Sequence, residues 1–310
     1  MIFFKHIQKP FNLKEMKYMK TLLPILIFIS LTGYIRAETM LNYSLPDSSS
    51  TKGINYTDDT FFSNRVVNGQ STEGIAQNRL DLRIEHRFGF IKDGFNQFFG
   101  LDQAYTFFGL EYGIKDWWMV GINRSFTDKT VAGFTKLSVF RQSTGAKNTP
   151  VSVSILLGTS VIGTIYTDPV RNNDFYSRIS YTTQVLIARK FSDNFSAQLS
   201  PVWLHRNIIP KIVDNNDLFA MGISARYKLT PTLSINGEYY PVINPSTYQQ
   251  QHYKNSLSFG LDVNTAGHVF QIVLSNSTDM IEKNFIGETT GDWMKGDIHL
   301  GFNILRKFDL

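Results

Sequence analysis

The sequence predicts an all-β protein: a single antiparallel up-and-down transmembrane β-barrel of about twelve strands. Three observations support this fold class. Apolar and polar residues alternate with a period of two over most of the chain after residue 78. The connections between these runs are alternately short and long. Beyond the first 37 residues, no apolar run is long enough for a transmembrane helix, so such a chain would cross a membrane with strands.

The clearest alternation lies in residues 103–126, which we interpret as two strands joined by a turn at Ile114–Asp116. Successive side chains of a strand point to opposite faces. Phe108 and Leu110 therefore share an apolar face, whereas Glu111 lies on a small, polar face. A soluble sandwich would bury the apolar face, and a membrane barrel would expose it to lipid. The alternation alone leaves both arrangements open.

The same period predicts the other strands of the barrel. The first, Arg79–Phe90, sets apolar residues against a row of alternating charges, which suits a lipid side and a polar lumen. After the two strands of residues 103–126, the predicted strands are Val131–Gln142, Val151–Gly158, Arg178–Arg189, Phe195–His205, Leu218–Leu229, Leu233–Val242, Ser256–Val263, His268–Asn276 and Asp297–Ile304. Twelve strands is an even number, as bacterial barrels have.

The lengths of the connections favour a membrane barrel over a soluble sandwich. With the N-terminus in the periplasm, the predicted external connections are Ile91–Asp102, Asp128–Thr130, Ile162–Phe175, Asn207–Asp217, Ile243–Lys254 and Ser277–Gly296. The predicted periplasmic connections are Ile114–Asp116, Ser143–Pro150, Lys190–Asn194, Thr230–Thr232 and Asn264–Gly267. Apart from Asp128–Thr130, the external connections are the longer ones, which is typical of outer-membrane barrels. A soluble sandwich has no reason to sort its loops in this way.

Aromatic residues gather at the ends of the predicted strands. Such clusters are typical of the aromatic girdles at membrane interfaces, although the general preference of aromatic residues for strands contributes to the pattern. The residues concerned are Tyr112, Trp117, Trp118, Phe126, Phe191, Phe195, Trp203, Tyr227, Tyr239 and Tyr240.

Residues 1–37 have the pattern of a secretory signal peptide. Lys17 and Lys20 precede the apolar run Leu22–Leu31, and Ala37 offers a small residue at the cleavage site. An uncleaved N-terminal anchor is the alternative. Residues 1–15 precede Met16 and Met19, either of which would be a normal start for a signal peptide. We therefore expect that the true start codon lies downstream of Met1. The predicted destination is the outer membrane, with both termini in the periplasm.

The charge of the chain belongs mainly to this N-terminal region. The whole sequence has 31 Lys and Arg against 26 Asp and Glu; without the six basic residues and one acidic residue of positions 1–37, 25 of each remain. A neutral mature chain gives no support for a nucleic-acid partner. The chain has no cysteine, which excludes disulfides and thiolate chemistry.

Residues 38–77 form a polar segment ahead of the barrel, residues 78–310. Within it, Phe61–Val67 is a short apolar island. This island is either a plug or lid packed in the barrel mouth or, as we favour, a small docking segment that satisfies local burial.

Ten ionisable residues are predicted to face the lumen. One interpretation is a polar conduction path through a lumen that is wider than in a filled eight-stranded barrel and narrower than in a porin. The other, towards which we lean, is a set of paired charges that fills and stiffens a closed barrel. The ten residues are Arg83, Glu85, Arg87, Glu111, Lys136, Arg178, Arg226, Glu238, Asp262 and His299.

Several motifs resemble a family of Bacteroidetes outer-membrane β-barrel proteins of unknown function. They are His86–Gly89, Phe99–Asp102, Leu110–Trp117, Val120–Ser125, Lys136 and Arg141–Gln142. The resemblance covers roughly residues 61–308 and implies a barrel in the outer membrane, with no established activity or catalytic residues. Barrel-insertion machinery usually reads a terminal aromatic residue, whereas here Phe308 is followed by Asp309 and Leu310.

The function predicted is a small-solute channel or transporter, in contact with the bilayer and its outer-membrane lipids. The alternatives are a structural or assembly barrel that binds a partner through its loops, and a membrane-embedded lipid-modifying enzyme. The enzyme hypothesis is disfavoured because none of the five histidines after residue 37 lies in a tight His-x-Ser arrangement. No zinc spacing, phosphate loop or dinucleotide motif occurs, so we expect neither a metal nor a cofactor.

Overall fold

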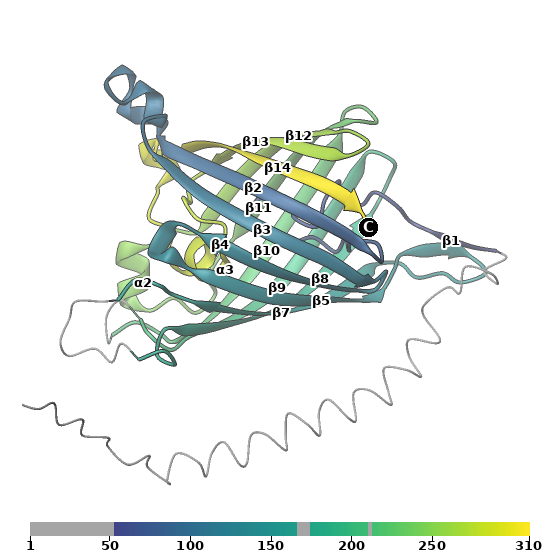
Figure 1. Ribbon diagram of the computed structural model, residues 1–310, viewed down its shortest axis with the longest axis horizontal. Coiled ribbons are helices and arrows are strands. Elements are labelled where there is room, and N and C mark those ends of the chain that lie inside the picture. Colours follow the sequence, from purple (N-terminus) through teal and green to yellow (C-terminus); the bar gives the residue numbers. More distant parts are fainter. Residues whose placement is uncertain (1–52, 166–173, 210–212) are drawn as a thin grey trace, which may run out of the picture. The chain divides into compact units, whose positions relative to one another are not determined.

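The computed structural model describes residues 53–165, 174–209 and 213–310. Within these residues, twelve strands form a closed antiparallel barrel (Figure 1). Each barrel strand pairs with its neighbours in sequence, and the last strand, β14, pairs with the first, β2, to close the wall. The predicted fold class is therefore confirmed. The predicted signal peptide and start codon lie outside the described residues.

The strands lie close to their predicted positions, with differences of a few residues at their ends. The barrel strands are β2 (Arg79–Phe90), β3 (Ala104–Lys115), β4 (Trp118–Ser125), β5 (Val131–Phe140), β7 (Ser152–Val161), β8 (Ile179–Lys190), β9 (Phe195–Arg206), β10 (Asp217–Lys228), β11 (Leu233–Tyr240), β12 (Ser256–Asn264), β13 (His268–Ser275) and β14 (His299–Asp309).

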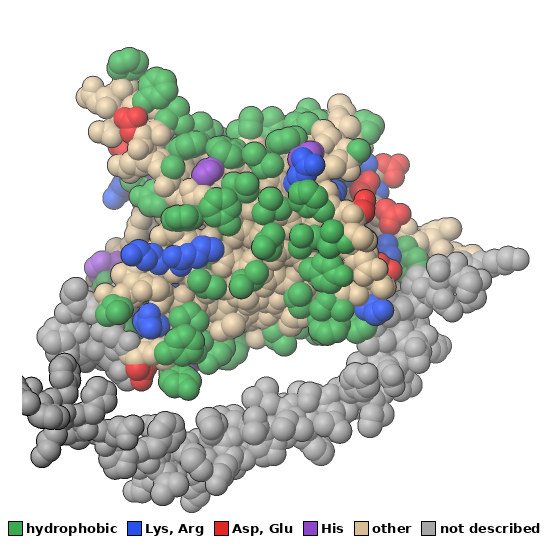
Figure 2. Space-filling view, viewed as in Figure 1, with side chains coloured by type: hydrophobic (Ala, Val, Ile, Leu, Met, Phe, Trp, Pro, Cys, Tyr) green, Lys and Arg blue, Asp and Glu red, His purple; other side chains and the backbone are tan. Residues whose placement is uncertain are grey.

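The wall of the barrel is apolar outside and mainly polar inside. In the β3–β4 pair, Leu110 faces Ile122, and these side chains are 48% and 58% exposed on the outside. One residue further along, Glu111 opposes Gly121 and is fully buried inside. Apolar side chains cover much of the visible outer wall (Figure 2). A closed wall satisfies the backbone hydrogen bonds of its strands, as a hydrocarbon environment requires.

The long connections gather at one end of the barrel, the loop end, and the short turns gather at the other, the turn end (Figure 1). The loop end carries the 3-10 helices η1 (Ile91–Asp93), η2 (Phe95–Gly100), η3 (Thr127–Lys129) and η4 (Trp293–Lys295) and the α-helices α2 (Thr247–His252) and α3 (Glu282–Gly287). The C-terminus lies at the turn end. None of the helices in the described ranges has the length and apolarity needed to span a membrane.

Two features of the fold were not predicted. The strand β1 (Ile54–Tyr56) pairs with β6 (Ser143–Gly145), so the polar N-terminal segment adds a two-stranded sheet to the turn between β5 and β7. Tyr240, expected in an aromatic girdle, is fully buried inside the barrel. Consecutive strand residues face opposite ways, so only one of Tyr239 and Tyr240 can point to lipid, and this is Tyr239.

Candidate functional site

The lumen holds part of the N-terminal segment, residues 60–73, which we call the inner segment. Most of its side chains are buried, and Val67 and Asn68 have no exposed surface. Its residues form hydrogen bonds with side chains from strands on all sides of the barrel, among them Glu111 of β3, Gln198 of β9 and Gln271 of β13. The inner segment therefore lies within the ring of strands.

Glu238 on β11 binds the tip of the inner segment through backbone groups. Its carboxylate accepts the N–H groups of Val67 at 3.2 Å, Asn68 at 2.8 Å and Gly69 at 3.0 and 3.3 Å. Three successive N–H groups turned towards one anion form a strong, charge-assisted anchor. The close approach requires glycine at position 69, because a Cβ atom there would lie 1.9 Å from the hydroxyl of Tyr240.

Basic residues on β2 and β5 hold the inner segment from other parts of the wall. Lys136 on β5 donates from Nζ to the carbonyl oxygens of Ser71 at 3.0 Å and Asn64 at 3.3 Å. Arg87 on β2 donates to Oδ1 of Asn68 at 2.6 Å. Arg83, also on β2, donates to the side chain of Asn64. The wall thus supplies charges, and the inner segment supplies carbonyl and amide partners for them.

Arg65 is the one basic residue of the inner segment, and it is buried inside the barrel beside β3. Its guanidinium is buried, 3.9 Å from Glu111 and 5.2 Å from the ring centroid of Phe107. Its Nη1 donates to the carbonyl oxygen of Asn68 at 2.7 Å, which closes the turn of the inner segment.

A second element enters the lumen from the loop end. The connection between β13 and β14 carries α3, and residues 279–289 of this connection, which we call the loop insert, are mostly buried. Asp279 fixes the start of the loop insert: Oδ1 accepts the N–H groups of Met280 and Ile281, and Oδ2 accepts the hydroxyl of Ser125 on β4. A connection that the sequence predicts as an external loop therefore folds inward in part.

Apolar and ionic contacts fix the rest of the loop insert. The ring of Phe285 packs edge-on against Tyr240 at a centroid distance of 5.1 Å. Arg206 at the end of β9 pairs with Asp214 at 3.0 Å and with Glu288 at 3.5 Å. Val202, Ala220 and Ile286 belong to the same apolar cluster as Phe285 and Tyr240.

The two inserts meet inside the barrel. Nη1 of Arg65 donates to the carbonyl oxygen of Met280 at 3.1 Å. This hydrogen bond joins a residue that enters from the turn end to a residue that enters from the loop end. Together, the inner segment and the loop insert occupy the middle of the lumen.

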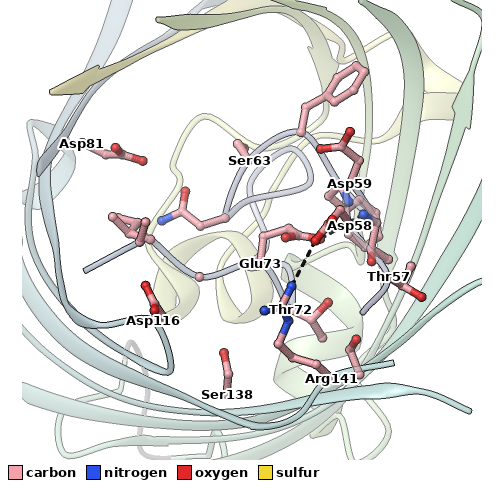
Figure 3. A pocket seen from close by; sticks show the side chains of 18 of the residues that line it. Thr57, Asp58, Asp59, Ser63, Thr72, Glu73, Asp81, Asp116, Ser138 and Arg141 are labelled. Carbon is pink, nitrogen blue, oxygen red and sulfur yellow. Dashed lines mark hydrogen bonds and ion pairs between the residues drawn. The ribbon is translucent and has the colours of Figure 1, made fainter. Parts of the chain in front are cut away.

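A polar cavity of about 360 Å³ remains at the turn end of the lumen (Figure 3). Residues of the inner segment form its floor, and Asp81, Asp116 and Ser138 belong to its wall. Glu73 lies in the cavity floor, and its Oε1 accepts the N–H groups of Thr60 and Phe61. The cavity thus contacts the inner segment directly.

Nine of the ten residues predicted to face the lumen are buried there, at most 3% exposed. Glu85 pairs with Arg83 at 3.1 Å. Asp262 accepts the amides of Asn236 and Gln271, and His299 lies 2.7 Å from the carbonyl oxygen of Phe88. Arg226 lies over the ring of Phe62 at 4.4 Å. The tenth residue, Arg178, stands apart. It precedes β8, is partly exposed and donates to the carbonyl oxygens of Ile162 and Asp174.

Sequence reasoning missed three important residues. Arg65 is the only charged residue in the apolar island Phe61–Val67. A single arginine in such a run could have predicted that its side chain is buried and pairs with a carboxylate. Arg206 falls one residue beyond the predicted end of its strand. Its partner Asp214 lies in a connection and is buried through contacts that no local pattern encodes.

Two of the histidines lie beside polar and aromatic neighbours. Nδ1 of His205 lies 2.9 Å from Oδ1 of Asp217, and its Nε2 lies 2.9 Å from Oδ1 of Asn207. His86 contacts the hydroxyl of Thr106 and the ring of Phe302 on the outer wall. In the described part of the chain, no group of three or more His, Cys, Asp or Glu residues could hold a metal ion.

Several solved outer-membrane proteins are similar to this chain at low identity. The NanC porin is 11% identical, over 74% of this chain and 100% of that one, with a TM-score of 0.46. The KdgM porin is 8% identical, over 74% and 99%, with a TM-score of 0.44. The COG4313 outer membrane channel from Pseudomonas putida F1 is 11% identical, over 76% and 98%, with a TM-score of 0.40. This likeness is too distant to carry an argument about function.

The family comparison is more specific. No curated protein matches the chain. The family described as membrane bound beta barrel domain (DUF5777) matches residues 61–308, a range that begins within the inner segment and ends in the last strand. The range thus includes both inserts as well as the wall. The chain belongs to this family of membrane-bound β-barrel domains.

Proposed function

We propose that the protein is an outer-membrane channel for small polar solutes whose lumen is closed in the conformation described above. In this proposal the inner segment is a plug and the loop insert is a second constriction. The observation that carries the proposal is the polar interface between the plug and the wall, centred on the Glu238 carboxylate and the three N–H groups that it accepts.

The energetics of this interface suit a movable plug better than a permanent core. Burying charges is expensive unless they are paired, and replacing them with well-packed apolar residues is often neutral or stabilising. A barrel that needed only a rigid filling could therefore use apolar side chains. Here the wall keeps Lys136, Arg87 and Glu238 pointed inward. When the plug withdraws, water can solvate these charges and the open lumen remains polar.

The plug makes fewer apolar contacts than polar contacts with the wall. Phe61, Val66 and Val67 form one cluster with Ala188 and Val273, and Phe62 forms another with two wall residues. Partial withdrawal would expose only these few side chains, so opening does not require the plug to lose a large hydrophobic core.

Conductance of refolded protein in planar bilayers tests the proposal. The unmodified chain is expected to be mostly closed with brief openings, and a variant that lacks both residues 60–73 and residues 279–289 is expected to conduct steadily. The heat-modifiable mobility of the folded barrel on gels is the control for an intact wall. A deletion variant that folds but conducts no more than bare bilayer would overturn the proposal.

A second candidate function is a structural or assembly barrel. The contact between Arg65 and Met280 favours it, because a lumen occupied from both ends and joined in the middle can also be a permanent filling. The small sheet of β1 and β6 at the turn end would then offer a surface for a partner. A stoichiometric partner captured by crosslinking in cells, together with no conductance from the deletion variant, would select this function.

The location of the protein is part of the proposal. We place both termini in the periplasm, because the short connections and the C-terminus share the turn end. The motifs between His86 and Gln142 support a relationship with Bacteroidetes outer-membrane barrels, and barrel-insertion machinery is the partner that such a location requires. Protease treatment of intact cells tests the orientation, since only the loop end should be cleaved.

A further inference from the structure

We propose that the connection between β2 and β3, residues 91–102, is a membrane anchor that lies in the headgroup and acyl boundary of the leaflet at the loop end. We call this connection the finger. The proposal rests on the membrane barrel alone and does not depend on whether the lumen conducts.

The tip of the finger carries exposed apolar side chains. Phe95 is 80% exposed, Phe98 is 54%, Phe99 is 50% and Leu101 is 38% exposed. Of the six residues of η2, only Gly100 is buried. Three exposed phenylalanines within five residues are unusual for a loop in water, because a contiguous apolar patch generally marks a contact surface.

The backbone holds these rings outward. Phe98 and Phe99 have φ values of 45° and 56°, in the left-handed region that bulky residues avoid. The turn is fixed by the N–H of Phe99, which donates to the carbonyl oxygen of Gly94 at 2.7 Å, and by Gly100, which sits against Gly89. Glycine or asparagine would adopt this turn with less strain. The loop conformation therefore does not explain the two phenylalanines, and a contact outside the chain would.

The finger projects outward past the wall near β2 and β3, and it does not cover the lumen (Figure 1). Apolar atoms lie at its tip (Figure 2). The outer wall beside it is also apolar, with Phe108 41% and Phe126 57% exposed and their rings 6.0 Å apart. The finger and this part of the wall thus both expose phenylalanine side chains.

The base of the finger is polar and tied to the loop end. Lys92 forms an ion pair with Asp297, and the N–H of Ile91 donates to the carbonyl oxygen of Ile298 at 2.9 Å. A polar base with an apolar, aromatic tip is the arrangement of an interfacial anchor. Four apolar side chains are few compared with the roughly 20–30 residues per side of a stable protein interface, so lipid suits the finger better than a second copy of the chain.

Depth measurements in liposomes test the anchor. Because the chain has no cysteine, Phe98→Cys gives a single site for an environment-sensitive fluorophore. The matched control is Met294→Cys, an apolar position on another loop of the same end that is 95% exposed. Lipids brominated on their acyl chains should quench the label at 98 several-fold more than the label at 294, and aqueous iodide should do the reverse. Equal quenching of both labels by iodide would overturn the proposal.

A second variant separates lipid contact from self-association. A label at Gln97→Cys should move from lipid to water when Phe95, Phe98 and Phe99 are all changed to serine, while the barrel keeps its heat-modifiable mobility. Two results would contradict the anchor. If the label loses its shielding from water when the protein is diluted into excess lipid, the contact is with a second copy of the chain. If the triple serine substitution leaves the label unchanged, the phenylalanines do not hold the finger in lipid.

Discussion

Glu238 accepts the N–H of Gly69 through both carboxylate oxygens, at 3.0 and 3.3 Å, and so joins the wall of the barrel to the turn of the inner segment. The two neighbouring N–H groups bind the same carboxylate. One wall residue therefore holds the tip of a segment that is about 170 positions away in sequence.

Glu238→Gln should loosen the inner segment. The amide keeps the shape of the side chain but loses the negative charge, and hydrogen bonds to charged groups contribute about 1.5–3 kcal/mol each, compared with about 1 kcal/mol for neutral ones. The open probability in planar bilayers should rise. Asp262→Asn is the matched control, because Asp262 is a buried wall carboxylate whose hydrogen bonds come from the side chains of Asn236 and Gln271. An equal response from both variants would contradict a specific role for Glu238.

Gly69→Ala should displace the tip of the inner segment by steric conflict. The new methyl group would lie 1.9 Å from the hydroxyl of Tyr240, which is far inside van der Waals contact. Gly74→Ala is the control, since a Cβ atom there meets its nearest neighbour at an ordinary 3.5 Å. Limited proteolysis in detergent should cleave the inner segment faster in the first variant than in the second. Equal cleavage would show that the tip does not sit against Tyr240.

Arg65→Gln should loosen both inserts at once. The substitution removes the hydrogen bond to the carbonyl oxygen of Met280 and the charge beside Glu111. Amide hydrogen exchange in α3 should therefore quicken, although the substituted residue belongs to the other insert.

The control for this coupling is Arg226→Gln. Arg226 binds the carbonyl oxygen of Asp59 and lies over Phe62, both ahead of Arg65 in the N-terminal segment. This variant should change exchange near residues 59–62 and leave α3 unaffected. Unchanged exchange in α3 with Arg65→Gln would show that the contact between the inserts carries no coupling.

Acid should favour the docked loop insert. Burial raises the pKa of Asp279 and of Glu282 above the ordinary values of their carboxyl groups. Between the ordinary and the raised pKa, the docked insert keeps protons that a released insert would lose, so docking takes up protons and is weakened as the pH rises. The open probability should fall as the pH is lowered from about 7 towards the ordinary carboxyl range of about 4.

The variant Asp279→Asn with Glu282→Gln is the control for this pH dependence. It has no carboxyl group at either position, so its open probability should change less over the same range. If the open probability of the unmodified protein rises on acidification, protonation does not favour the docked loop insert.

The wall could be predicted from sequence because its pattern is local. Each strand alternates on its own, so Glu111 could be assigned to the lumen from its neighbours Leu110 and Tyr112. The same reasoning predicted that ten ionisable residues face the lumen, and nine of them are buried in the structure. Arg178 differs because it lies just before β8, where the alternation no longer determines the direction of a side chain.

The contents of the lumen could not be predicted in the same way. The contact of Arg65 with Met280 joins residues 215 positions apart, and neither lies in a periodic element. The burial of Asp214 depends on Arg206, at the end of another element. Such contacts depend on the assembled barrel, and local propensity carries no information about them.

We propose that residues 60–73 close the lumen and leave it when the channel opens. The most direct test is a reversible tether between Thr72→Cys and Ser154→Cys, positions at which the hydroxyl of Ser154 now donates to the carbonyl oxygen of Thr72 at 3.1 Å. In planar bilayers, openings should be absent while the disulfide is intact and should return when a reductant is added. Openings that persist with the disulfide fully formed would contradict this proposal.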